Sequence, residues 1–128
     1  MHRPNELSGI IVDAAIKVHS HLGPGLLESV YHQVLRHELT RRSLSVKSEV
    51  VVPIEYEGLK FDEGFKADLI VEDTVLIEVK SVKELHDVHK KQTLTYLRLT
   101  GLSLGLLINF NESLLKHGII RIVNNFTE

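Results

Sequence analysis

The sequence contains no cysteine among its 128 residues. This absence excludes disulfide bonds and metal sites built from thiolates, and it is typical of a reducing compartment, so we expect the protein in the cytoplasm. An excess of basic residues is also missing, because 15 Lys and Arg face 17 Asp and Glu, for a net charge of −2. A surface coated with positive charge is therefore excluded, and any contact with nucleic acid must be local.

Long apolar runs are absent as well. Residues 1–6 do not form the apolar core of a signal peptide, and no run reaches the roughly 20 residues that span a bilayer, so we expect no membrane partner. The sequence has no Gly-rich phosphate loop, serine-nucleophile elbow or cysteine nucleophile. What remains is an ordinary globular composition, 43% hydrophobic and 25% charged, which predicts one domain over residues 1–128.

Hydrophobic residues at helical spacing predict three helices. The first is expected to have Asn5 or Ser8 as its N-cap and to stop at Gly23. The second follows the break at residues 23–25 and ends near residues 41–43. The third is expected over about residues 83–100, with Gly101 as its end. Its apolar stripe is expected to contain Leu85, Val88 and Leu99, with Leu94 and Leu97 beside it.

Alternating or continuous apolar residues predict five strands. The first covers residues 46–56, and Pro53 makes it an edge strand or a bulged one. Two runs, 65–71 and 75–79, flank a short acidic turn and form a hairpin, with Lys80 directly after the second run. The last two strands are residues 104–110 and 119–123, with a helical turn between them. The order α-α-β-β-β-α-β-β predicts an α/β fold with a mixed central sheet and helices on its faces.

Three charged residues stand at the end of this hairpin. Glu78 and Lys80 are two residues apart and therefore share a face of the second hairpin strand, and Asp68 lies on its neighbour. Two carboxylates and a substrate phosphate suffice for a hard cation such as Mg²⁺, while a lysine can orient a water and neutralise developing charge. The alternative is a solvated Glu78–Lys80 ion pair, with Asp68 an unrelated charge beside the turn.

The length of the turn decides between these interpretations. A two-residue turn at Glu72-Asp73 would pair Asp68 with Ile77 and place Asp68 on the face opposite Glu78. A shared site therefore requires an odd-length loop or a bulge, and we predict one.

Three motifs in order carry a resemblance to a known family. The second helix opens with Gly25, Glu28 and Tyr31 at G-x-x-E-x-x-Y spacing, the hairpin carries Asp68 and Glu78-Val79-Lys80, and the third helix carries Q-x-x-x-Y at Gln92 and Tyr96. Over roughly residues 6–123 the chain resembles the GxxExxY protein family, a compact branch of the PD-(D/E)xK nuclease-like superfamily. One departure is Ala67, which precedes Asp68 where the superfamily's name has proline.

The resemblance implies a restriction-endonuclease-like core, α-β-β-β-α-β, to which this chain adds a helix and a strand. It implies that Asp68, Glu78 and Glu28 bind Mg²⁺ or Mn²⁺, with Glu28 acting directly or through water. Lys80 would serve the attacking water, and Gln92 and Tyr96 would face the acids. The substrate would be nucleic acid, with DNA expected rather than RNA.

Each motif residue also has a structural interpretation. Tyr31 and Tyr96 lie on apolar helix faces and could be core residues whose hydroxyls are satisfied. Gln92, placed on the inward face, could form a hydrogen bond to Lys80 or to a water. Glu28 could favour the positive end of its helix dipole.

Histidines and basic residues supply further candidates. A zinc site from His19, His21 and His32 with Glu28 is conceivable, but its members straddle the break at residues 23–25. A locally basic patch that touches phosphates, or else a solvated helix face, is predicted from Lys83, His86, His89, Lys90 and Lys91. A second basic cluster comprises Arg36, His37, Arg41, Arg42 and Lys47.

Two functions therefore follow from the sequence. The first is a metal-dependent nuclease that hydrolyses phosphodiester bonds. The second is a catalytically inactive binding or interaction module on the same fold. The small chain leaves little room for a recognition domain, so a homodimer or a partner protein is compatible with both.

Overall fold

The computed structural model describes residues 2–128, and its elements follow the predicted order, with the predicted helical turn before the last strand present as a short 3-10 helix. In chain order they are α1 (Pro4–Leu22), α2 (Glu28–Arg41), β1 (Val46–Tyr56), β2 (Leu59–Val71), β3 (Val75–Lys80), α3 (Asp87–Thr100), β4 (Leu104–Asn109), η1 (Leu115–Gly118) and β5 (Ile119–Val123).

The five strands form one mixed sheet in the order β1-β2-β3-β4-β5. Neighbouring strands are antiparallel except β3 and β4, which are parallel and joined by α3 as a crossover. A parallel pair needs such a crossover, because a tight turn can join only antiparallel strands. The predicted α/β class with a restriction-endonuclease-like arrangement is confirmed.

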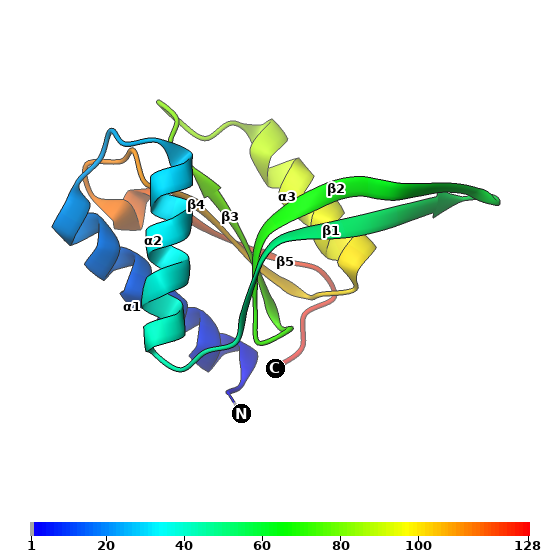
Figure 1. The fold of residues 1–128 in the computed structure, drawn as a ribbon, viewed down its shortest axis with the longest axis horizontal. Helices are drawn as coiled ribbons and strands as arrows, with labels where there is room; N and C mark the ends of the chain where they lie inside the picture. Colours follow the sequence, from blue (N-terminus) through cyan, green and yellow to red (C-terminus); the bar gives the residue numbers. More distant parts are fainter. Residues whose placement is uncertain (1) are drawn as a thin grey trace.

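Helices cover both faces of this sheet (Figure 1). Helices α1 and α2 pack together on one face and form the larger core with alternate side chains of β2, β3 and β4. Helix α3 covers the other face, where the smaller core consists of Ala67, Ile70, Leu76 and Leu97, with partly buried Phe65 and Tyr96 packed against it. Asp68, Glu78 and Lys80 have the same strand parity as Ile70 and Leu76, so they belong to the face that α3 covers.

Two helix starts differ from the prediction. Helix α1 begins at Pro4, a residue that suits the first turn, so neither Asn5 nor Ser8 is its cap. Helix α3 begins at Asp87 rather than near residue 83, because His86 is its N-cap and exchanges hydrogen bonds with His89 in a capping box. The centre predicted for the apolar stripe of α3 is also wrong, because Val88 and Leu99 are exposed. The buried residues are Thr93 and Leu97, the latter predicted beside the stripe.

Strand β1 lies at the sheet edge, and its register with β2 shifts between Val52 and Ile54. Both predictions made from Pro53, an edge position and a bulge, are confirmed. Beyond this bulge, β1 and the added first half of β2 leave the sheet as a long two-stranded arm (Figure 1). Within residues 2–128 no helix is both long and apolar enough to cross a membrane.

Candidate active site

The loop between β2 and β3 has the odd length that a shared site requires. Val71 pairs with Val75 and Leu69 pairs with Ile77, so the loop contains three residues, 72–74. Glu72 and Asp73 both adopt positive φ angles, 53° and 51°, and form the tight turn. Asp68 therefore lies opposite Glu78 on the same face, as predicted from the register.

At this point the two strands separate, and the carboxylates replace the missing ladder bonds. The backbone N–H of Asp68 donates to Glu78 Oε2 at 2.9 Å, and the backbone N–H of Val79 donates to Asp68 Oδ2 at 2.7 Å. Each acid thus satisfies an amide of the neighbouring strand with one oxygen. No other hydrogen bond is formed by either carboxylate within residues 2–128, so the second oxygen of each remains available.

The electrostatic state of Glu78 follows from its position. Only 5% of the residue is exposed. Burial and the adjacent Asp68 charge raise the pKa of Glu78 from 4.5 to about 8, against the opposing effects of the Asp68 N–H and Lys80. A positive ion beside these two carboxylates would relieve this repulsion.

Asp68 is half-buried, and burial likewise raises the pKa of its carboxyl group. The hydrogen bond from Val79, the His32 ring and Lys80 oppose this rise, while Glu49 adds to it. Strand β1 therefore brings a further carboxylate toward Asp68. Glu49 has φ 51°, an uncommon value within a strand, between the pairs Ser48–Leu69 and Val50–Ala67.

Lys80 ends β3 beside the acids. Its backbone carbonyl accepts a hydrogen bond from Phe110 N–H at 2.8 Å, which fixes the strand end against β4. Its side chain is half-buried and takes part in none of the ion pairs formed within residues 2–128. The alternative of a solvated Glu78–Lys80 ion pair is therefore wrong, because Glu78 is buried and the two side chains do not pair.

Tyr96 approaches the acids from α3. Its ring stacks on Phe65, with centroids 3.9 Å apart and planes 6° from parallel. Burial, and then the charges of Glu78 and Asp68, raise the pKa of the Tyr96 phenol. One helical turn earlier, Gln92 is exposed, so its predicted inward position is wrong.

Glu28 is the first residue of α2 and is exposed. It lines a small cleft of about 180 Å³ together with Ser29, His32, Asp68 and Val79. Its charge also contributes to the raised pKa of Glu78. Over the described residues, however, no three His, Asp or Glu side chains converge closely enough to hold one metal ion together.

The donor set nonetheless fits a hard divalent cation. Mg²⁺ and Mn²⁺ prefer carboxylate oxygens, and Mg²⁺ keeps several waters when one or two carboxylates hold it. Asp68 and Glu78 each have one uncommitted oxygen, and their mutual repulsion is of the kind that a cation removes. Glu28 is near enough for its charge to act on Glu78.

A family model described as the PD-(D/E)XK nuclease superfamily matches residues 5–122. The chain belongs to the PD-(D/E)XK nuclease superfamily. A search among curated proteins gave no match. Asp68 and Glu78 face each other across the hairpin and Lys80 ends β3. Their assignment as the residues of the superfamily signature stays a prediction.

Sequence reasoning missed the residues that hold this nuclease-like site in place. Asn109 is fully buried, and its side chain accepts hydrogen bonds from the backbone of Val82 and Asn111 and donates to the Val82 carbonyl. Ser81 donates to the Leu26 carbonyl at 2.7 Å. These bonds tie the segment after Lys80 to β4 and to the loop before α2. A polar residue within the apolar run 104–110 was the available signal for Asn109.

Tyr31 has the structural role that was one of its two interpretations. It is fully buried and stacks on Phe110 with ring centroids 4.7 Å apart. Its hydroxyl donates to the Gly23 carbonyl and accepts from Leu26 N–H. Tyr31 thus closes the loop that positions Glu28, and Gly25 supplies the φ of 96° that the loop needs.

The remaining candidates are dispersed. The His19 ring forms a hydrogen bond with the Glu112 carbonyl, whereas the His32 ring forms one with the Ser48 hydroxyl. Two of the histidines considered for a zinc site are therefore hydrogen-bonded to different parts of the chain. In the patch on α3, His86 and His89 cap the helix and Lys90 pairs with Asp87 at 3.8 Å. Contact of nucleic acid with Lys83, His86, His89, Lys90 and Lys91 stays a prediction.

Proposed function

We propose that this chain hydrolyses phosphodiester bonds of nucleic acid with the help of Mg²⁺ or Mn²⁺, with DNA preferred over RNA. Membership of the nuclease superfamily supports the general activity. The observation that carries the proposal is the reciprocal bonding of Asp68 and Glu78 to each other's strands, which leaves one oxygen of each carboxylate uncommitted. The charge of Lys80 acts on both acids, and its amine forms no ion pair within residues 2–128.

In this proposal Asp68 and Glu78 hold the cation, and Glu28 holds one of its waters. The bound cation would supply a Lewis acid and lower the pKa of a coordinated water. Lys80 orients the attacking water and stabilises the negative charge that develops on the phosphate. Tyr96 forms the wall of the site against α3, whereas Gln92 is exposed and receives no role in this proposal.

The test is a cleavage assay with the full chain. Duplex, single-stranded and supercoiled DNA and single-stranded RNA are incubated with Mg²⁺ or Mn²⁺, or with EDTA. We expect cleavage that needs the cation, and a loss of at least about 100-fold in Glu78→Gln, Asp68→Asn and Lys80→Met, the magnitude typical for a preorganised charged group. The exposed arm residue Glu63, changed to Gln, is the matched control and should cut like the wild type.

The proposal fails if no substrate is cut with either cation, or if Glu78→Gln cuts as fast as the wild type. Circular dichroism of each variant separates a lost site from a lost fold. Gln is the preferred substitution because its side-chain oxygen can still accept the Asp68 N–H.

A catalytically inactive module is the second candidate. It is favoured by the fact that both acids already satisfy backbone amides, and that no group of three metal-binding side chains converges within residues 2–128. Such a module would keep the acids for structure alone and would show no stabilisation by metal. The GxxExxY branch, the cytoplasm and a homodimer or partner protein stay predictions.

A further inference from the structure

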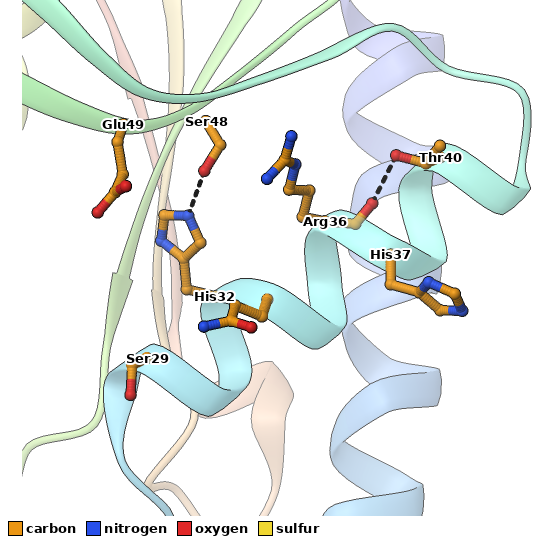
Figure 2. A pocket seen from close by; sticks show the side chains of 8 residues that line it. Ser29, His32, Arg36, His37, Thr40, Ser48 and Glu49 are labelled. Carbon is orange, nitrogen blue, oxygen red and sulfur yellow. Dashed lines mark hydrogen bonds between the residues drawn. The ribbon is translucent and has the colours of Figure 1, made fainter.

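A groove of about 510 Å³ lies between α2 and β1, next to the acidic cleft. Figure 2 shows its lining, with His32 and Arg36 reaching from α2 toward Ser48 and Glu49 of β1. The groove follows α2 from Ser29 to Thr40, roughly 16 Å at about 1.5 Å per residue. It is thus an elongated channel rather than a compact pocket for a small molecule.

The groove and the acidic cleft are continuous. Ser29 and His32 line both of them, and the cleft adds Glu28 and Asp68. The His32 ring is held toward the strand because its Nε2 lies 2.7 Å from Ser48 Oγ (Figure 2). Any extended ligand that occupies the groove therefore leads directly to the candidate metal ligands.

Arg36 is the cation that distinguishes this groove. Three neighbouring basic residues are paired with acids, Lys17 and Arg42 with Glu38 and Lys47 with Asp73, whereas Arg41, which has no ion pair within residues 2–128, lies outside the lining. The guanidinium of Arg36 has no ion pair or hydrogen bond within residues 2–128, although it projects between helix and strand (Figure 2). A planar guanidinium left without a carboxylate in a polar groove is suited to phosphate oxygens.

We infer that the α2–β1 groove binds the sugar-phosphate backbone of the strand that enters the active site, with Arg36 and His32 contacting phosphates next to the one that is cut. This inference rests on the proposed function, because it names the path of that substrate. Ser29, Thr40 and Ser48 add hydroxyl donors that can reach phosphate or sugar oxygens. At about 3.4 Å per nucleotide along a duplex, the groove matches four to five nucleotides.

Glu49 limits where phosphates lie. It is the one carboxylate in the lining, and it stands beside His32 at the end nearest Asp68 (Figure 2). Phosphates are therefore expected along Arg36 and toward Thr40, with a gap beside Glu49. Neutralising Glu49 should strengthen binding, whereas neutralising Arg36 should weaken it, and these opposite signs are the specific signature of the groove.

The experiment measures binding without cleavage. The wild type and the variants are titrated into a short fluorescein-labelled DNA strand or duplex in EDTA, and anisotropy is recorded at several salt concentrations. We expect Arg36→Gln to bind about three- to tenfold more weakly, irrespective of base sequence. A plot of log affinity against log salt concentration should be less steep for Arg36→Gln than for the wild type. The slope should decrease by the contribution of one phosphate, ~0.7 for a single strand or ~0.9 for a duplex.

One variant is the control, and a second tests the expected effect of opposite sign. Arg98→Gln removes an exposed arginine from α3, on another part of the molecule, and should bind like the wild type. Glu49→Gln should bind more tightly than the wild type. Arg and Gln have similar helix propensities, and melting curves confirm that each variant is folded.

The inference is overturned if the wild type does not bind, if Arg36→Gln binds like the wild type, or if Arg98→Gln weakens binding equally. It is also overturned if a free nucleoside triphosphate competes as well as a strand at equal phosphate concentration. These outcomes are independent of the cleavage assay. If Arg36→Gln loses binding but neither the wild type nor any variant cuts DNA, only the proposed nuclease activity is refuted. If Arg36→Gln binds and cuts like the wild type, only the proposed binding of the strand in the groove is refuted.

Discussion

Asp68 and Glu78 each use one carboxylate oxygen as a substitute for a strand carbonyl. This arrangement explains how two acids can stand where a sheet splits, since each amide that the separation leaves without a ladder partner receives a strong acceptor. It also fixes the rotation of both side chains before any ligand arrives. The remaining cost is electrostatic, because two carboxylates on one face repel each other.

This cost predicts a pH dependence of the metal-free protein. The folded-state pKa of Glu78 is raised to about 8 from its ordinary value of 4.5. Between these pH values the folded form keeps a proton that the unfolded form has lost, so stability is greatest at low pH and falls as pH rises toward 8. We expect a loss on the order of a few kcal/mol that is absent in Glu78→Gln.

The measurement is urea unfolding of the wild type and Glu78→Gln in EDTA at several pH values. Groups such as Glu38, whose pKa is lowered chiefly by its hydrogen bond from Arg42, titrate in both proteins and cancel in the difference. The difference curve should therefore favour the variant increasingly at high pH. Parallel curves would show that Glu78 is not protonated in the folded protein.

Asn109 supplies a second prediction at the scale of one residue. Its side chain makes three hydrogen bonds to backbone groups in the segments around Val82 and Asn111. Asn109→Ala should lose about 2–4 kcal/mol of stability, because buried partners are left without a hydrogen bond. Asn109→Asp keeps the two hydrogen bonds that the side chain accepts, so its stability should lie between that of the wild type and that of Asn109→Ala.

We propose that Asn109 positions Lys80, because its side chain holds the backbone of Val82, two residues after Lys80. We expect Asn109→Asp to lower kcat while KM for DNA changes little, since the groove on α2 is elsewhere. An equal loss in both parameters, or a loss of stability with unchanged kcat, would mean that Asn109 serves the fold alone.

Individual residues differ in how far the sequence predicts them. The joint position of Asp68 and Glu78 was predicted because a shared site needs it. Parity across a short loop is a local property, so register arithmetic showed that the loop must be odd or bulged, but it did not fix the loop length. Asn109 and the His32–Ser48 contact join segments 27 and 16 residues apart, and no local pattern encodes such pairings. Gln92 was placed inward because of its motif, but the helix rotation that buries Thr93 and Leu97 leaves it exposed.

At the scale of elements, the loop between α1 and α2 decides where Glu28 points. Tyr31 closes it through two hydrogen bonds of one hydroxyl, to Gly23 and from Leu26. Tyr31→Phe keeps the stack on Phe110 and removes only these bonds. We expect about 1 kcal/mol of destabilisation and faster amide exchange at Leu26, because water replaces the hydroxyl in this exposed loop.

The matched control for this change is Tyr56→Phe, since Tyr56 is 68% exposed on the arm. It should leave both stability and exchange at Leu26 unchanged. Protection of Leu26 that is unaffected in Tyr31→Phe would contradict the role assigned to the hydroxyl.

Element boundaries show where pattern reading works and where it stops. Strands β1 and β5 have the predicted bounds, because turn residues and β-branched runs mark both ends. Helix α3 starts late because a histidine cap is not among the usual signals. The outer half of β2 was missed because every residue from Leu59 to Gly64 is exposed, so no apolar alternation marks it as a strand.

At the scale of the molecule, charge is distributed rather than concentrated. The chain carries a net charge of −2, and the arm beyond the bulge bears Glu55, Glu57, Asp62 and Glu63 beside exposed Tyr56, Leu59 and Phe61. Such a surface does not favour a phosphate backbone. Under the proposed function, attraction of nucleic acid would come from the α2–β1 groove, from the predicted patch on α3 and from a bound cation, and metal and substrate would then strengthen each other's binding.

The last prediction concerns the stability of the whole molecule as metal is added. An ion that binds only the folded state stabilises it by about 2.7 kcal/mol at 100 times its dissociation constant. For a chain of this size that corresponds to a rise in Tm of roughly 10 °C. We expect Mn²⁺ to produce such a rise in the wild type at pH 8, and to produce none in Asp68→Asn or Glu78→Gln, which lack one of the two carboxylates.

Glu63→Gln is again the control and should respond to Mn²⁺ like the wild type. The titration separates the two candidate functions without relying on a substrate. A metal-dependent nuclease requires stabilisation that both site variants abolish, whereas acids kept only to satisfy the strand amides would leave the melting temperature unchanged by Mn²⁺ in all four proteins. Because the carboxylates repel each other most when both are ionised, the response should also grow between pH 6 and pH 8, as each bound ion displaces the proton of Glu78.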